Sequence, residues 1–105
     1  MPSKVFINGG TWTVRAMTKK EVKANTFKES VNHGVTNPKT KEILIRPGLN
    51  KDDAAQTLLH EGLHAICYQN SHIFPVGSLF SNEEAIHALT NSLMGFLKST
   101  GLMPA

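Results

Sequence analysis

The chain has 105 residues, a length that suits one domain spanning residues 1–105 and leaves no room for a second hydrophobic core. Apolar residues make up 40% and charged residues 18%, which excludes a disordered or collagen-like chain. The net charge of +3 is a mild excess. No aromatic platform or nucleic-acid-binding motif accompanies it, so we do not expect a nucleic-acid partner.

The composition also bears on compartment and stability. No apolar run approaches the length of a membrane span, and residues 1–7 lack the apolar core of a signal peptide. Cys67 is the only cysteine, which excludes an intrachain disulfide. A bound metal is the remaining cross-link that could stabilise a small core. We expect a cytoplasmic protein that does not contact membranes.

The first half of the chain has the pattern of β-strands. Lys4–Ile7 and Thr11–Met17 flank Asn8-Gly9-Gly10, a sequence typical of a tight turn, and together they predict a hairpin. The second strand alternates, with Trp12, Val14 and Ala16 on one side and Thr11, Thr13 and Arg15 on the other.

A second hairpin is predicted further along the chain, from Val31–Thr36 and Ile43–Arg46. Between the two hairpins, Thr18–Ser30 is polar and indicates either a loop or a short helix, with Phe27 as a core residue.

The second half of the chain predicts two helices. The first runs from about Lys51 to Gln69, with Asn50 as its N-cap. Its apolar stripe contains Ala55, Leu58, Leu59, Gly62, Leu63 and Ile66. The second runs from about Asn82 to Lys98, with Ser81 as its N-cap and Glu84 completing a capping box. Its stripe contains Ile86, Leu89, Leu93, Phe96 and Leu97.

These elements predict an α+β fold: a small, twisted, mostly antiparallel sheet of N-terminal hairpins packed on the first long helix, followed by a C-terminal helix.

His60-Glu61-Gly62-Leu63-His64 matches H-E-x-x-H within the first predicted helix. Residues four apart lie one above the other on a helix, so His60 and His64 can present two imidazole nitrogens to one metal ion. Glu61 is turned about 100° from His60, beside the metal and not on it. It can therefore take a proton from water that zinc acidifies, as a general base.

A catalytic zinc site needs a third protein ligand, and an acidic pair follows about twenty residues later. On the second helix, Glu83 lies at the edge of the apolar stripe whereas Glu84 lies near the opposite face. If the stripe packs on the first helix, Glu83 is the ligand and Glu84 a capping residue. If the stripe packs on the sheet instead, Glu84 faces the metal.

Leu58–Ile66 and Glu83–Leu89 resemble the two helices of small gluzincin-type zinc metallopeptidases, such as the ImmA/IrrE-like proteins and the compact metallopeptidase-like proteins of phages and prophages. The resemblance covers about Glu42 to Gly101. It implies a twisted sheet on the active-site helix, with an edge strand along the substrate cleft, here Ile43–Arg46. A peptide or protein substrate would add to that edge through backbone hydrogen bonds.

Peptide hydrolysis also needs a donor for the oxyanion of its tetrahedral intermediate. Tyr68, His72, His87 and His33 are candidates, and each is also consistent with an ordinary surface or structural residue. His87 follows Glu83 by four residues and is a candidate to brace that carboxylate. Cys67 is interpreted as a small buried apolar residue and not as a ligand.

The sequence thus predicts a zinc metallopeptidase that binds Zn²⁺ through His60, His64 and Glu83, with Glu61 as the catalytic base. The alternative is a zinc-stabilised binding or regulatory module without turnover, in which Glu61 has no chemical role. A metal-free nucleic-acid accessory protein would rest only on the mild positive charge.

Overall fold

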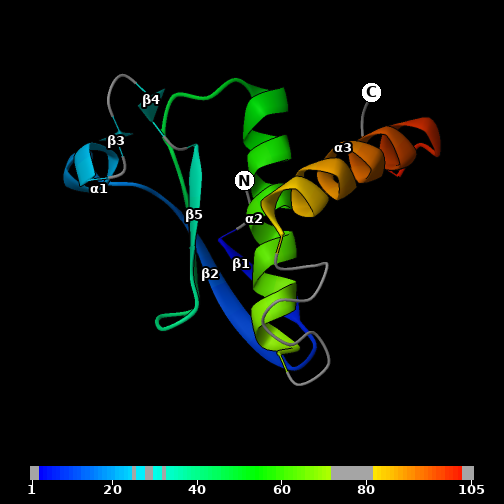
Figure 1. Ribbon diagram of the computed structural model, residues 1–105, viewed down its shortest axis with the longest axis horizontal. Coiled ribbons are helices and arrows are strands. Elements are labelled where there is room, and N and C mark those ends of the chain that lie inside the picture. The colour runs from blue at the N-terminus through cyan, green and yellow to red at the C-terminus, as the bar shows by residue number, and fades with distance from the viewer. Residues whose placement is uncertain (1–2, 25, 28–29, 32, 72–81, 103–105) are drawn as a thin grey trace.

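The computed structural model describes residues 3–24, 26–27, 30–31, 33–71 and 82–102 (Figure 1). Its strands are β1 (Lys4–Ile7), β2 (Gly10–Ala16), β3 (Thr26–Phe27), β4 (Ser30–Val31), β5 (Gly34–Asn37) and β6 (Glu42–Ile45). Its helices are α1 (Lys19–Ala24), α2 (Lys51–Gln69) and α3 (Glu83–Ser99). The fold is α+β, as predicted: α2 covers one face of the main sheet, and α3 packs on α2.

The main sheet has the order β1-β2-β6-β5, with β2 and β6 parallel and the other two pairs antiparallel. The prediction that Ile43–Arg46 forms the edge strand is therefore wrong. Its three apolar residues, Ile43–Ile45, are all buried, as is typical of a strand with neighbours on both sides. The edge strand on this side of the sheet is β5, residues Gly34–Asn37.

The first hairpin forms as predicted, and its turn docks on the end of α2. Asn8 and Gly9 both have positive φ, at 40° and 83°, as a two-residue hairpin turn requires. Trp12 is 1% exposed, and its indole N–H donates to Oε1 of Gln69 at 3.0 Å. A Cβ at Gly10 would overlap the Gln69 side chain, so only glycine permits this approach.

The main core lies between α2 and the sheet and contains Trp12, Val14, Ile43, Ile45 and Ala65. Leu58 packs against this core, whereas much of the predicted α2 stripe does not belong to it. Ala55, Leu59, Gly62 and Ile66 line an apolar groove with Met94 and Leu97 of α3, and the core residues Ile43 and Leu58 form part of its wall. Leu63 of the predicted stripe is buried, as are the polar residues Thr57 and Glu61, whose burial an apolar period does not reveal.

Helix α3 begins as predicted but differs in its cap and its buried face. Asn82, not Ser81, is the N-cap, and its side-chain oxygen accepts from the backbone N–H groups of Glu84 and Ala85. Ile86 and Thr90 are the buried residues, whereas Leu89 and Phe96 are exposed. Burial of Thr90 is tolerated because its hydroxyl donates to the Ile86 carbonyl at 2.8 Å.

Several other sequence predictions can be placed. Short helix α1 and the β3–β4 pair occupy the segment interpreted as a loop or a helix. Cys67 is half-buried, and desolvation raises the pKa of its thiol. The Phe27 side chain, His72 and Ser81 lie outside the described residues. In the part of the chain that is described, no helix has both the length and the apolar character that crossing a bilayer would require.

Candidate metal centre

The two histidines of the H-E-x-x-H sequence project from one face of α2. The Asn50 cap begins this helix by accepting from the Asp53 backbone N–H at 2.8 Å, and the helix continues without interruption through the motif. The rings of His60 and His64 consequently lie one turn apart, with centroids separated by 5.1 Å. Their side chains are 21% and 18% exposed, so each ring is supported on one side and open to the cleft on the other.

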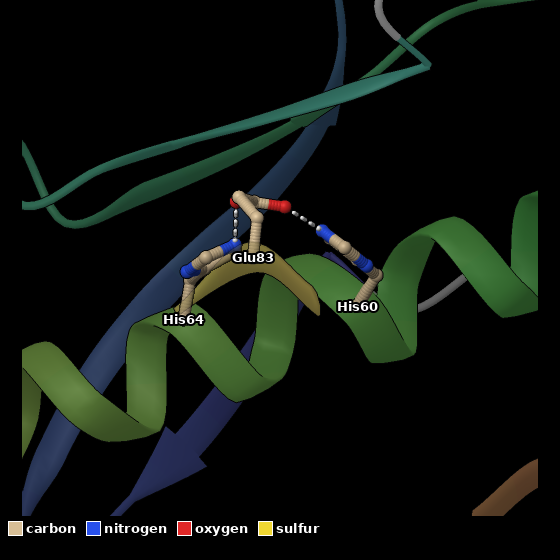
Figure 2. A group of neighbouring side chains, drawn as sticks. All are labelled: His60, His64 and Glu83. Atoms are coloured by element: carbon tan, nitrogen blue, oxygen red, sulfur yellow. Dashed lines mark hydrogen bonds and ion pairs between the residues drawn. The ribbon is translucent and has the colours of Figure 1, made fainter. Parts of the chain in front are cut away.

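Glu83 of α3 places its carboxylate between the two imidazoles, as Figure 2 shows. Its Oε2 lies 3.2 Å from Nε2 of His60, and its Oε1 lies 2.6 Å from Nε2 of His64. One donor atom from each of the three residues falls within 4.8 Å of the others. Glu84 is exposed and is not part of this group. Of the two alternatives for the third ligand, the geometry therefore favours Glu83.

The register between α2 and α3 explains why Glu83 reaches the histidines. Asp52 lies 3.7 Å from Lys98 near the start of α2, and the Gln56 amide donates to Asn91 at 2.9 Å one turn later. These contacts run in order toward Glu83, so the start of α3 meets the middle of α2, which α3 crosses at a steep angle (Figure 1). Because Asn82 serves as the cap, the Glu83 carboxylate is free to face α2.

The donor set fits a zinc ion in its chemistry. Two imidazole nitrogens and one carboxylate oxygen are a standard catalytic zinc set that keeps a fourth position open. Bonds of about 2.0–2.1 Å in a tetrahedral site place ligand atoms roughly 3.3 Å apart. The 3.2 Å between Nε2 of His60 and Oε2 of Glu83 matches this spacing. Nε2 of His64 instead contacts the other oxygen, Oε1, at 2.6 Å, so the carboxylate would shift to bring one oxygen to an ion between the two rings.

Glu61 lies beside this donor set without belonging to it. Glu61 is only 8% exposed, and its two carboxylate oxygens have different surroundings. Oε1 accepts a hydrogen bond of 2.7 Å from the hydroxyl of Thr36 on β5. Oε2 lies 4.0 Å from Nε2 of His60 and is therefore directed toward that ring. A carboxylate in this position can exchange a proton with a water molecule at the metal site.

An open cleft of about 730 Å³ surrounds these groups between α2, α3 and β5. The Arg46 N–H donates to the His33 carbonyl, which makes His33–Arg46 a hydrogen-bonded pair of the β5–β6 ladder. Since such pairs alternate with non-hydrogen-bonded ones, the backbone groups of Gly34 and Thr36 point away from β6. Among the residues that the structure describes, they form an unpaired edge of the sheet beside the candidate metal centre.

Three of the four proposed oxyanion donors line the same cleft: Tyr68, His87 and His33. Tyr68 is half-exposed, and the ring of His87 lies 6.3 Å from that of His60. His72, the fourth candidate, lies outside the described residues.

Sequence reasoning missed the contribution of β5 to the site. Gly34 and Thr36, two positions apart on β5, share the strand face that meets α2. A Cβ at Gly34 would lie 2.7 Å from Cγ2 of Thr57 on that helix. The available signal was the small residue two positions before a hydroxyl residue in a predicted strand. That pattern has meaning only once the strand is known to pass over Glu61.

Comparison of the chain with protein-family models, with curated proteins and with solved structures finds no match. The side chains of the cleft and their geometry are therefore the basis for inferring a function.

Proposed function

We propose that the chain is a zinc-dependent metallopeptidase of the gluzincin type, resembling the ImmA/IrrE-like proteins. The observation that carries this proposal is the relation of Glu61 to the His60–His64–Glu83 group. A buried carboxylate has one oxygen 4.0 Å from Nε2 of His60, and His60 is one of three side chains that converge in an open cleft and could hold a metal ion. A hydrolytic zinc site requires such a base next to the ion and not bound to it.

His60, His64 and Glu83 would hold the zinc ion, with two ligands from α2 and the third from α3. When bound, zinc would polarise a substrate carbonyl and acidify a water molecule. Glu61 would accept the proton of the attacking water at Oε2 and donate it to the nitrogen of the leaving amine. Tyr68, His33 and His87 remain the candidates within the cleft for stabilising the oxyanion.

The substrate would be an extended peptide or an unfolded protein segment lying along β5. The outward backbone groups of Gly34 and Thr36 offer the hydrogen bonds for one added strand. This position replaces the Ile43–Arg46 strand, whose two edges are already paired with β2 and β5. We keep the cytoplasm as the proposed compartment, because Cys67 is the only cysteine of the sequence.

A zinc-stabilised binding or regulatory module is the second candidate function. The three donor atoms come from two helices, which favours this alternative. An ion held by both α2 and α3 would cross-link the two helices of a small domain. In such a module Glu61 would have no chemical role.

The test uses the full chain loaded with one equivalent of zinc and incubated with a mixture of unstructured peptides. Mass spectrometry then detects new peptide termini. We expect cleavage by the wild-type chain, and Glu61→Gln should reduce its rate by about 10²–10⁴-fold while zinc stays bound. Zinc binding by both chains without Glu61-dependent cleavage would support the binding module and contradict the peptidase.

A further inference from the structure

The Thr36 hydroxyl joins the edge strand to the buried carboxylate of Glu61. It lies 2.7 Å from Oε1 and 3.0 Å from the backbone carbonyl oxygen of the same residue. A threonine hydroxyl has one proton to donate, and the shorter contact is the one to the carboxylate. A hydrogen bond to an ionised acceptor is stronger than one to a neutral carbonyl, so Oε1 is the preferred acceptor.

This hydrogen bond distinguishes the two oxygens of Glu61. With Oε1 held by β5, rotation of the carboxylate is restricted, and Oε2 remains directed toward His60. Gly34 supports the same arrangement, because a Cβ there would lie 2.8 Å from Cγ of Glu61 and displace the side chain. On β5, Gly34 therefore leaves space for the Glu61 side chain, and Thr36 holds its carboxylate by a hydrogen bond.

We propose that Thr36 is a positioning residue: its hydroxyl fixes the carboxylate of Glu61 so that the free oxygen faces the metal centre. This inference rests on the proposed hydrolytic function. Thr36 makes two hydrogen-bond contacts through its hydroxyl, both with Glu61. It acts through Glu61, while its backbone groups lie on the edge proposed to receive the peptide. Thr36 would thus position both partners: its backbone would bind the substrate strand, and its hydroxyl would orient the catalytic base.

The experiment compares Thr36→Val, which removes the hydroxyl at nearly constant shape, with Thr36→Ser, which keeps it. Steady-state hydrolysis and zinc affinity are measured for the full chain carrying each variant. Loss of a group that orients a functional side chain should lower kcat about 10–100-fold in Thr36→Val, with KM and zinc affinity nearly unchanged. Thr36→Ser should recover most of the lost kcat. Equal activity of Thr36→Val and wild type, or equal losses in both variants, would overturn the proposal.

A second measurement is independent of hydrolysis. The thermal midpoint is recorded for wild type, Thr36→Val, Glu61→Leu and the double variant. Thr36→Val should lower Tm by about 5 °C in the wild-type background. It should lower Tm by less in the Glu61→Leu background, because only the backbone carbonyl of residue 61 remains there to accept the hydrogen bond. Identical decreases in both backgrounds would show that Thr36 stabilises the protein without the Glu61 carboxylate and would overturn the proposal.

The two measurements separate this inference from the proposed function. Coupling in Tm together with an inactive wild-type chain would contradict the peptidase, and with it the catalytic consequence of the Thr36 contact. An active wild-type chain without coupling would contradict the role of Thr36 alone.

Discussion

Gly34 on β5 and Glu61 on α2 approach so closely that a Cβ at Gly34 would lie 2.8 Å from Cγ of Glu61. This contact brings the edge strand against the polar side of α2, where the candidate metal centre lies. Because the Thr57 methyl lies at 2.7 Å from the same position, the neighbouring atoms would have to shift to accept even a methyl group.

Gly34→Ala is therefore expected to destabilise the protein and to displace Glu61. Overpacking of this kind costs about 1–3 kcal/mol, which chemical denaturation followed by circular dichroism can measure. Peptide hydrolysis should fall as well. Gly95→Ala is the matched control, since no atom lies within 4 Å of a Cβ at this α3 position. It should leave activity intact and raise stability by about 0.5–1 kcal/mol. Equal stability of Gly34→Ala and wild type would refute the close contact.

The acidic pair at the start of α3 offers a matched comparison for the third ligand. Glu83→Gln should weaken zinc binding by at least about 100-fold, because the carboxylate between His60 and His64 is lost. Glu84→Gln should leave the affinity within a factor of about two, since Glu84 is exposed and outside the donor group. Competition with a chromogenic chelator gives both affinities. A larger loss from Glu84→Gln than from Glu83→Gln would show that Glu84 is the ligand.

Away from the site, Arg15 bonds Glu21 at 2.7 Å and Glu42 at 2.9 Å. The hydrogen bonds from Arg15 lower the pKa of Glu21 from 4.5 to about 2. A depressed folded-state pKa means that this pairing stabilises the fold above pH 4.5, the unfolded value. The contribution is lost as the pH falls toward about 2.

The lowered pKa of Glu21 predicts how the stability of the fold changes with pH. The Tm of wild type should exceed that of Glu21→Gln above about pH 5, and the difference should shrink steadily toward about pH 2. Added salt should reduce the difference at neutral pH, because the groups are partly exposed and are screened. Scanning calorimetry across this range provides the measurement. A difference that does not change with pH would show that Glu21 acts without its charge.

Local signals predicted the helices and much of the site. Helix α2 begins at Lys51 and ends at Gln69, as Asn50 and the apolar spacing indicated. The placement of Glu83 toward α2 followed from the helical period, although the buried face of α3 is centred on Ile86 and Thr90. Thr90 was missed because an internal hydrogen bond allows a polar residue to be buried.

Non-local pairing could not be predicted in the same way. The parallel register of β2 with β6 joins Val14 to Ile43 across a long connection, and no local signal specifies it. That pairing determines which strand becomes the edge, so Ile43–Arg46 was assigned wrongly. The contact between Thr36 and Glu61 depends on the same topology. Local sequence patterns therefore could not predict it.

His60, His64 and Glu83 are proposed to bind one zinc ion. The most direct test is the zinc content per chain, measured by elemental mass spectrometry in protein purified without added metal or an affinity tag containing histidine. We expect about one zinc per chain for wild type and a value far below one for His64→Ala, because the two remaining ligands bind the ion weakly. An absence of zinc in wild type, with none taken up on titration, would contradict the proposed site.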